Sequence, residues 1–328
     1  MRRRKNNLVI ILLSIMCILI GFIAGMIVIH EVDAKHEKIK TDALKEEIRE
    51  AKKPVNVYFP KRNIKYGEIP RNSYNPDNFV IEDGFMAYYN ENGEKISHVG
   101  VDLSYHNNKV DFKKLADSPV EFVMLRCGYR GYTEGGLIED ERFKEYAKAA
   151  NENNLKLGVY FFTQAITEQE AISEADYVIK LIENYDISYP VAFDIEYVED
   201  EEARTNTAEL SREDLSKICI AFCERIKEAG YYPMIYASEN WLRRKLDVSM
   251  LKEYDFWAPQ YLDENDFLYD FTIWQYTDSG NAPGVEGSCD LNVSMVDYAK
   301  FVPSLREAIK TNGEIGEYSD NTPNITIQ

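Results

Sequence analysis

Two acidic residues, one position apart, end an apolar stretch in the middle of the chain. Residues 189–196 are rich in Val, Ala, Phe and Ile, a composition typical of a buried strand, and they end in Asp194 and Glu196. Side chains at positions i and i+2 of a strand point the same way, with Cα atoms about 6.5–7 Å apart. Two carboxylates there are costly unless they meet solvent, a cation or a substrate. The pair is therefore either a chemical site or the point where a strand runs out into the charged loop 198–202.

The segments around this pair alternate between strands and helices from about His98 onward. Helices are predicted at 140–153, 168–185, 211–229 and 240–246, and strands at 99–104, 121–129, 156–163, 189–196, 232–237, 255–261, 271–276 and 289–293. Ser211 followed by Asp214 is a capping-box pattern, and Gly230 follows that helix. Repeated strand–helix units predict a parallel α/β sheet with right-handed crossovers. Eight strands predict closure into a TIM-like barrel that lacks its last helices.

Further acids fall at the same end of this predicted barrel. Such barrels carry their chemistry at the C-terminal ends of the strands. Asp102 ends the first strand and Asp290 lies in the eighth, and these strands are neighbours once the barrel closes. We therefore expect four acids from distant parts of the chain to converge on one mouth, which favours a site over coincidence.

An uncharged segment precedes the barrel. Residues 8–29 form a run of 22 residues without a charge, behind the sequence Met-Arg-Arg-Arg-Lys. A helix of that length spans roughly 33 Å, enough for a bilayer core. The cations before it and Glu31 and Asp33 after it predict a cytoplasmic N-terminus. A signal peptide cleaved near 32–34 is the alternative, but the run exceeds the typical apolar region of about 7–15 residues, so we favour an uncleaved anchor.

The chain is predicted to have four parts. Residues 1–30 are the cytoplasmic tip and transmembrane anchor, 31–97 a juxtamembrane helical stalk, linker and hairpin arm, 98–303 the barrel, and 304–328 a helix end and disordered tail. Within the arm, 79–96 predicts a hairpin that has its turn at 90–93 and packs against the barrel.

Composition excludes several partners. A net charge of −18 argues against nucleic acid and against binding an anionic membrane through surface charge. The five cysteines show no ligand spacing for zinc, so neither a metal nor another cofactor is expected. Cys127, Cys219, Cys223 and Cys289 are expected to be buried free thiols, and Cys17 lies in the apolar segment.

Eight segments follow one another in order along residues 98–303. They are Gly100-Val101-Asp102-Leu103-Ser104, Phe122-Val123-Met124-Leu125-Arg126, Gly158-Val159-Tyr160-Phe161-Phe162, Phe193-Asp194-Ile195-Glu196, Gly230-Tyr231-Tyr232-Pro233-Met234-Ile235-Tyr236, Trp257-Ala258-Pro259-Gln260-Tyr261, Trp274-Gln275-Tyr276 and Asp290-Leu291-Asn292. The ordered set resembles the glycoside hydrolase family 25 lysozymes, the Chalaropsis-type N-acetylmuramidases. The resemblance implies a flattened (β/α)5β3 barrel. It also implies a peptidoglycan substrate, cut at the β-1,4 bond between N-acetylmuramic acid and N-acetylglucosamine.

The resemblance also implies roles for the acids. Glu196 matches the general acid, which needs a raised pKa, and a neighbouring carboxylate supplies part of that shift. Asp194 would stabilise oxocarbenium-like charge or hold the 2-acetamido group of the sugar as it attacks. The second is favoured because the predicted spacing exceeds the ~5–5.5 Å of a direct nucleophile, although a water-based mechanism also fits. Asp102 and Asp290 would orient these two acids and bind sugar hydroxyls.

Several further side chains are candidate saccharide contacts, with barrel packing as the alternative for each: Tyr160, Tyr236, Trp257, Gln260, Trp274 and Arg126. Many relatives carry His where this chain has Phe161, so a polar contact from that position is in doubt. The expected partners are peptidoglycan glycan strands and, through residues 8–29, a lipid bilayer, with the barrel facing the cell wall. A catalytically inactive wall-binding module on the same barrel is the alternative function, and the retention of all four acids argues against it.

Overall fold

The computed structural model describes residues 57–59, 64–66, 69, 71–262, 264–300 and 302–303. The predicted membrane segment 8–29, the stalk and the predicted tail lie outside these residues. Within the described ranges, no helix has the length and apolar character that crossing a bilayer requires.

Eight strands close into a barrel, as the sequence predicts. They are β5 (His98–Leu103), β6 (Phe122–Arg130), β8 (Lys156–Phe162), β9 (Val191–Asp194), β10 (Pro233–Tyr236), β11 (Asp255–Pro259), β12 (Ile273–Gly280) and β13 (Cys289–Ser294). The strands from β5 to β12 pair in parallel, and β13 closes the barrel by running antiparallel to both β12 and β5. A short strand that was not predicted, β7 (Leu137–Glu139), pairs antiparallel with β6.

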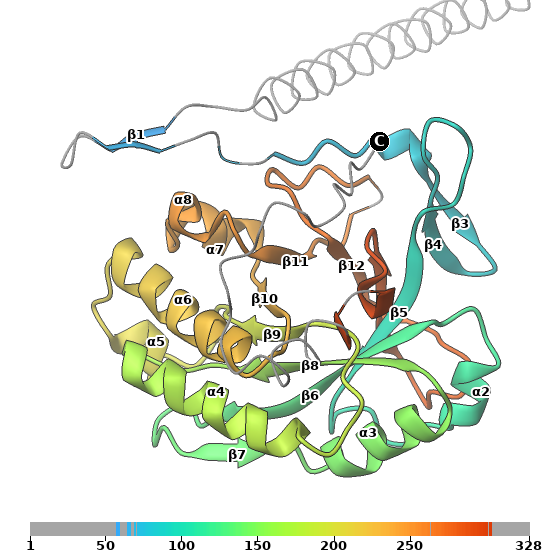
Figure 1. Ribbon diagram of the computed structural model, residues 1–328, viewed down its shortest axis with the longest axis horizontal. Coiled ribbons are helices and arrows are strands. Elements are labelled where there is room, and N and C mark those ends of the chain that lie inside the picture. The colour runs from blue at the N-terminus through green and yellow to red at the C-terminus, as the bar shows by residue number, and fades with distance from the viewer. Residues whose placement is uncertain are drawn as a thin grey trace, which may run out of the picture. The chain divides into compact units, whose positions relative to one another are not determined.

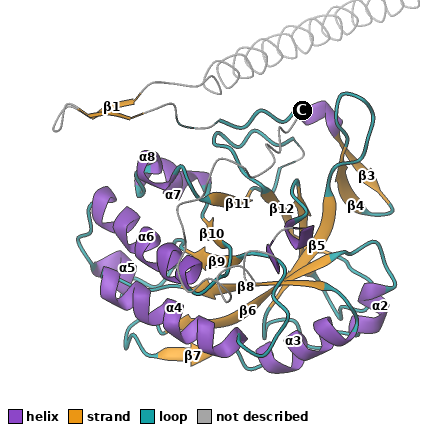
Figure 2. Ribbon diagram, in the orientation of Figure 1, coloured by secondary structure: helices purple, strands orange, loops and turns teal. Residues whose placement is uncertain are grey.

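Helices cover one side of the barrel more fully than the other. They are α2 (Phe112–Ala116), α3 (Phe143–Glu152), α4 (Glu168–Ile182), α5 (Arg204–Thr207), α6 (Arg212–Glu228), α7 (Glu239–Arg244), α8 (Val248–Leu251) and the 3-10 turn η2 (Tyr298–Lys300). Figure 1 shows α3, α4 and α6 along the outside of β6, β8, β9 and β10. Loops rather than long helices join β11, β12 and β13 (Figure 2), which agrees with the prediction of missing last helices. The capping box of α6 is present, with Ser211 and Asp214 bonded reciprocally, and Gly230 follows with a φ of 85°.

Strand alternation separates the inside of the barrel from the outside. Phe122, Met124, Met234, Trp257 and Ile273 belong to the cluster inside the barrel, whereas their sequence neighbours pack outward against helices and loops. The ring of Phe122 lies where a Cβ of residue 100 would be, 2.2 Å from that position, so β5 needs Gly100 to pass it. Filled below in this way, the barrel leaves its polar residues near the C-terminal ends of the parallel strands.

The arm before the barrel forms the predicted turn at 90–93 and, ahead of it, a hairpin turn that was not predicted. After the 3-10 turn η1 (Pro76–Asn78), β3 (Phe79–Glu82) pairs antiparallel with β4 (Phe85–Tyr88). The chain reverses at Asp83 and Gly84, which both have positive φ (51° and 85°), as a two-residue hairpin turn requires. The predicted turn at 90–93 then returns the chain, with an antiparallel bridge between Tyr89 and Lys95 and with the Ile96 N–H donating to the Tyr88 carbonyl at 3.1 Å. A further pair, β1 (Val57–Phe59) and β2 (Ile64–Tyr66), was not predicted.

The arm packs against the barrel as expected. The ring of Phe79 lies edge-on to Trp274, with centroids 5.0 Å apart, and the Met86 N–H donates to the Tyr276 hydroxyl at 3.1 Å. Nothing in the structure tests the boundaries predicted for the four parts of the chain. The prediction for the thiols is confirmed at Cys127, Cys219, Cys223 and Cys289, which are buried and free, whereas Cys17 lies outside the described residues.

Candidate active site

The four predicted acids line one cleft of about 430 Å³, a volume usual for ligand sites. Asp102 is the fifth residue of β5, Asp194 ends β9, and Glu196 follows two residues later. Asp290 is only the second residue of β13, yet it pairs directly with Asp102 because β13 runs antiparallel to β5. The reversed direction of β13 therefore places its beginning at the edge where the parallel strands end.

Asp102 and Asp290 form a hydrogen-bonded pair of carboxyl groups. The amide of Gln275 donates to Asp102 at 2.8 Å and to Asp290 at 3.1 Å, and the Asn292 amide donates to Asp102 at 2.8 Å. Burial raises the pKa of Asp102 to about 6, although the donors Asn292 and Gln275 oppose the shift. Burial and then the charge of Asp102 raise the pKa of Asp290 to about 8. At neutral pH Asp290 therefore keeps its proton, while Asp102 is the carboxylate that the amides hold.

The pKa values of Asp194 and Glu196 are both raised, which favours their protonated forms. Burial, and secondly the charge of Glu196, raises the pKa of Asp194 well above its ordinary value. Its side chain is almost fully enclosed, and its Oδ1 has no hydrogen-bond partner among the described residues. Burial, and secondly the charge of Asp102, raises the pKa of Glu196 to about 7. Near neutral pH, Glu196 can therefore both donate and accept a proton, as general acid–base catalysis requires.

Aromatic side chains enclose a smaller compartment beside the same acids. It measures about 80 Å³ and is lined by Tyr160, Tyr236, Trp257 and Gln275 in addition to the four acids. Trp257 lies edge-on to Tyr160 and Tyr236, with ring centroids 5.7 and 4.8 Å away. The Tyr236 hydroxyl donates to Gln275 Oε1 at 3.0 Å. A compartment of this size holds a group of a few heavy atoms between apolar rings.

Arg126 lines the opposite, larger part of the cleft, together with Ser104, His106, Asn107, Tyr132 and Phe162. Its Nε donates to Asp140 at 2.8 Å, and its guanidinium lies over the Tyr105 ring at 4.7 Å. Four of the six predicted saccharide contacts, Tyr160, Tyr236, Trp257 and Arg126, thus lie at the cleft with the acids.

The structure does not bring Trp274 and Gln260 to the cleft. In β12, Ile273 and Gln275 face the barrel interior, so Trp274 points outward, where it is fully buried against the arm. Its indole N–H donates to the Gln260 carbonyl at 2.7 Å, and the Gln260 amide binds Asp266 at 2.6 Å. For these two residues, packing is the reading that the structure supports.

Gln275 and Asn292 are site residues that sequence reasoning missed. Both lie inside the quoted segments Trp274-Gln275-Tyr276 and Asp290-Leu291-Asn292. A usable signal was present, because Asn292 is two positions from Asp290 and a strand places such residues on one face. Tyr261, another missed residue, donates its hydroxyl to Gln275 Oε1 at 2.7 Å from the loop after β11.

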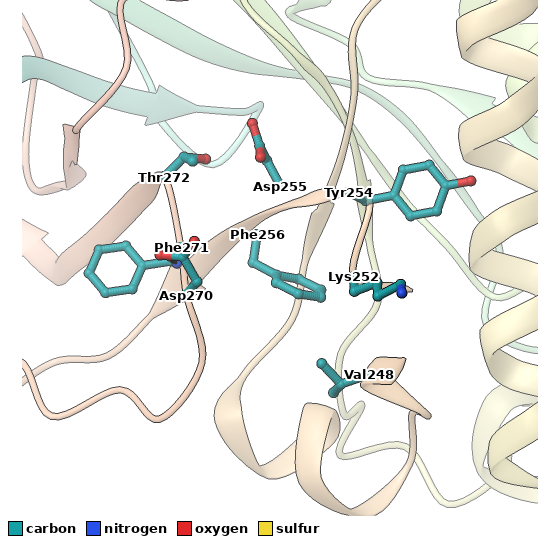
Figure 3. A pocket seen from close by; sticks show the side chains of 8 residues that line it. All are labelled: Val248, Lys252, Tyr254, Asp255, Phe256, Asp270, Phe271 and Thr272. Carbon is teal, nitrogen blue, oxygen red and sulfur yellow. Dashed lines mark hydrogen bonds between the residues drawn. The ribbon is translucent and has the colours of Figure 1, made fainter. Parts of the chain in front are cut away.

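Another cavity, of about 50 Å³, lies at the other end of the barrel. Figure 3 shows the side chains that line it. Its lining includes Asp255, the first residue of β11, and Thr272, which precedes β12. Asp255 accepts hydrogen bonds from the Tyr232 and Tyr298 hydroxyls at 3.0 and 2.6 Å. These bonds satisfy a buried carboxyl within the barrel floor, so we assign this cavity to packing.

No group of three His, Cys, Asp or Glu side chains within the described ranges is arranged to hold a metal ion. The expectation that the protein needs no metal stays a prediction. The chemically active groups that line the cleft are mainly carboxyl groups. Acids of raised pKa between aromatic walls, at the C-terminal mouth of a barrel, are the arrangement that glycoside hydrolases use.

Comparison with known proteins also indicates a glycoside hydrolase, and it identifies the family. The sequence profile described as Glycosyl hydrolases family 25 matches residues 101–285, more than half of the chain, and the chain belongs to this family. It is 25% identical over 194 residues to an autolytic lysozyme of Clostridium acetobutylicum, an alignment that covers 59% of this chain and 54% of that protein.

Solved structures show the same fold. The modular autolysin LytC from Streptococcus pneumoniae superimposes with a TM-score of 0.54 and 28% identity, covering 66% of this chain and 51% of that one. A family 25 glycosyl hydrolase from Bacillus anthracis gives a TM-score of 0.53 at 20% identity, covering 68% and 99% respectively. The chain spans about half the length of the autolytic lysozyme and of LytC.

Proposed function

We propose that this protein is a peptidoglycan hydrolase that cleaves the β-1,4 bond between N-acetylmuramic acid and N-acetylglucosamine. The observation that carries the proposal is the cleft in which Glu196 lies together with Asp102, Asp194 and Asp290, where burial raises the pKa of Glu196 to about 7. The names of the relatives support the substrate class, since they include an autolytic lysozyme and an autolysin whose structure was determined with a synthetic peptidoglycan ligand.

In the proposed mechanism, Glu196 is the general acid. Its carboxyl proton passes to the glycosidic oxygen as the bond from that oxygen to the anomeric carbon breaks. The acetamido oxygen of the N-acetylmuramic acid residue attacks the anomeric carbon of that residue and forms a cyclic intermediate. Glu196, now a carboxylate, then takes a proton from the water that opens this intermediate. Two displacements at one carbon retain the anomeric configuration.

Asp194 is proposed to hold the acetamido group during the attack. Its Oδ1 is buried and meets no hydrogen-bond donor in the part of the chain that the structure describes, and an acetamido N–H would be a suitable donor to it. The adjoining compartment of about 80 Å³, with Tyr236 and Trp257 in its wall, has room for the four heavy atoms of that group. Asp102 and Asp290, held by Gln275, are proposed to keep both acids in place. An anomeric assay that finds inverted product would exclude this version.

Analysis of the reducing ends released from purified cell wall tests the function. We expect the 328-residue chain to release fragments that end in N-acetylmuramic acid, and Glu196→Gln to lower the rate about 100- to 10,000-fold. Glu199→Gln, an exposed acid three positions away, is the matched control and should act like the wild type. Ends in N-acetylglucosamine would refute the assigned bond. Binding to wall without release would instead support the inactive binding module.

We also propose that residues 8–29 anchor the protein in the cell membrane, with the N-terminus in the cytoplasm and the barrel facing the wall. The support is the uncharged run of 22 residues behind four cationic residues. We expect the full chain to sediment with membranes and a chain that starts at residue 31 to stay in solution. Intact cells stripped of wall should expose the barrel to added protease. A secreted product shortened near residue 34 would favour the cleaved signal peptide instead.

A further inference from the structure

Arg126 is held rigidly at the cleft wall. Its Nε donates to Asp140 Oδ2 at 2.8 Å, and the Asp140 side chain is fully buried. The same carboxylate accepts the Tyr105 N–H at 3.2 Å and the Arg142 N–H at 3.0 Å, so its position is fixed from three sides. The guanidinium also lies over the Tyr105 and Tyr129 rings, at 4.7 and 5.4 Å from their centroids. Little side-chain freedom remains to be lost when a ligand binds.

This arrangement leaves one strong donor unused. Nη2 of Arg126 is buried and has no hydrogen-bond partner among the described residues. An arginine that serves only as an ion-pair partner commonly offers two nitrogens to its carboxylate, yet Nε alone of Arg126 binds Asp140. A buried donor without an acceptor is costly, and such groups often belong to sites that a ligand completes.

Arg126 places a positive charge in a cleft that is lined mainly by acids. Five acids line the larger compartment, namely Asp102, Asp194, Glu196, Asp278 and Asp290. Among the described residues, Arg126 is the one Arg or Lys in that lining. Burial and the charge of Arg126 lower the pKa of His106, so its ring is neutral at physiological pH. The described part of the lining therefore offers Arg126 as its fixed cation, which favours an oxygen acceptor that is anionic or strongly polarised.

We propose that Arg126 is the subsite for the lactyl group on C3 of N-acetylmuramic acid. The acceptor is an sp² oxygen, either the free lactyl carboxylate or the amide carbonyl that joins the stem peptide. The two sugars of peptidoglycan share the acetamido group and differ at C3, where N-acetylglucosamine has a hydroxyl and N-acetylmuramic acid has the lactyl ether. An arginine that binds this group therefore separates muramyl glycan from chitin. The inference rests on the proposed function, because it names the part of that substrate that Arg126 recognises.

The test measures binding in the full chain carrying Glu196→Gln, so that turnover does not interfere. Three glycans are compared: muramyl glycan with stem peptides, the same glycan stripped of peptides, and chitin oligomers of equal length. We expect Arg126→Gln to weaken binding of both muramyl glycans about 10- to 100-fold, because a charge-assisted hydrogen bond is lost. Binding of chitin oligomers should change by less than about threefold. Arg126→Lys should keep more affinity for the carboxylate form than for the amide form, because it retains charge without the planar fork.

Two controls make the outcomes decisive. Arg243→Gln removes an exposed arginine from α7 and should change none of the three affinities. If Arg126→Gln alone fails to fold because Asp140 is left unpaired, the double change Arg126→Gln with Asp140→Asn removes both charges. Equal losses for muramyl glycan and chitin, no loss for either, or no binding of any muramyl glycan would overturn the inference. Arg126-dependent binding without release of reducing ends by the wild type would support the inference and refute the hydrolase.

Discussion

Burial contributes most to the raised pKa of Glu196, and neighbouring charge comes second. From the sequence, Asp194 is the neighbour expected to raise the pKa of Glu196. In the folded protein, the charge that raises it belongs instead to Asp102 on another strand. Conversely, Glu196 is the charge that helps to raise the pKa of Asp194. The proton is therefore controlled by a cluster of acids in a shared low-polarity site rather than by one adjacent pair.

This control predicts the pH dependence of activity. A general acid works only when protonated, so kcat/KM should fall as the pH rises through the pKa of Glu196, about 7. The measurement is kcat/KM for muramyl glycan across about pH 5 to 9 at constant ionic strength. A rate that stays level through pH 8 would remove Glu196 from the role of general acid.

Gln275 on β12 links the acids of neighbouring strands. Its amide donates to Asp102 and Asp290, while its oxygen accepts from the Tyr236 and Tyr261 hydroxyls. Hydrogen bonds to a carboxylate favour its charged form, so the pKa of Asp102 depends on this amide. Gln275 is therefore a positioning residue, since it acts through the acids.

Replacing Gln275 tests this role. Gln275→Leu should raise the pKa of Asp102 and lower kcat by about tenfold or more, because the acid pair loses its shared donor. The low-pH side of the rate profile should move to higher pH, a change that altered packing alone would not produce. The matched control is Gln260→Leu, because that glutamine binds Asp266 outside the cleft. Equal losses from both substitutions would contradict the assignment.

The capping box of α6 predicts an effect on stability without an effect on activity. The Ser211 side chain accepts the Asp214 N–H, and the Asp214 carboxylate accepts the Ser211 N–H. Ser211→Ala should lower the free energy of unfolding by about 1 kcal/mol and Tm by about 2–4 °C. Calorimetry measures the change, and kcat/KM should stay that of the wild type. A loss of activity at equal folded fraction would mean that α6 also positions the site.

The whole protein should become less stable as the site acids ionise. The pKa values of Asp102 and Asp290, about 6 and 8, exceed the ordinary aspartate value of about 3.9. Between those limits the folded chain binds more protons than the unfolded chain, so stability falls as the pH rises. This cost of keeping ionisable acids in a cleft is a common feature of active sites.

Asp290→Asn tests this effect directly. The variant cannot ionise at that position, and its amide can still donate to Asp102. We expect a Tm above that of the wild type near about pH 8.5, where the wild-type carboxyl ionises. Near about pH 4.5, where Asp290 carries a proton, the two proteins should melt alike. A lower Tm at both pH values would show that the Asp290 carboxyl stabilises the fold.

The strands and the acids at their ends could be predicted from local pattern. These signals depend on residues only a few positions apart, so the sequence alone reveals them. They are the apolar runs, the capping box at Ser211 and the glycine at 230. The turn at 90–93 was predicted, whereas the turn at Asp83-Gly84 was missed, although an Asp-Gly pair between two apolar runs is a local hairpin signal.

Alternation along β12 predicts that residues 274 and 275 face opposite ways, but not which one faces the cleft. Closure of the barrel determines which residue faces the cleft: Gln275 points inward, and Trp274 packs beneath the arm. The chain order alone sets the strand sequence and the types of residue at the strand ends, because both follow from local propensity and period. The direct pairing of Asp102 with Asp290, 188 positions apart, and the raised pKa values exist only in the folded barrel. They require antiparallel closure by β13 and the exclusion of water by side chains from several strands.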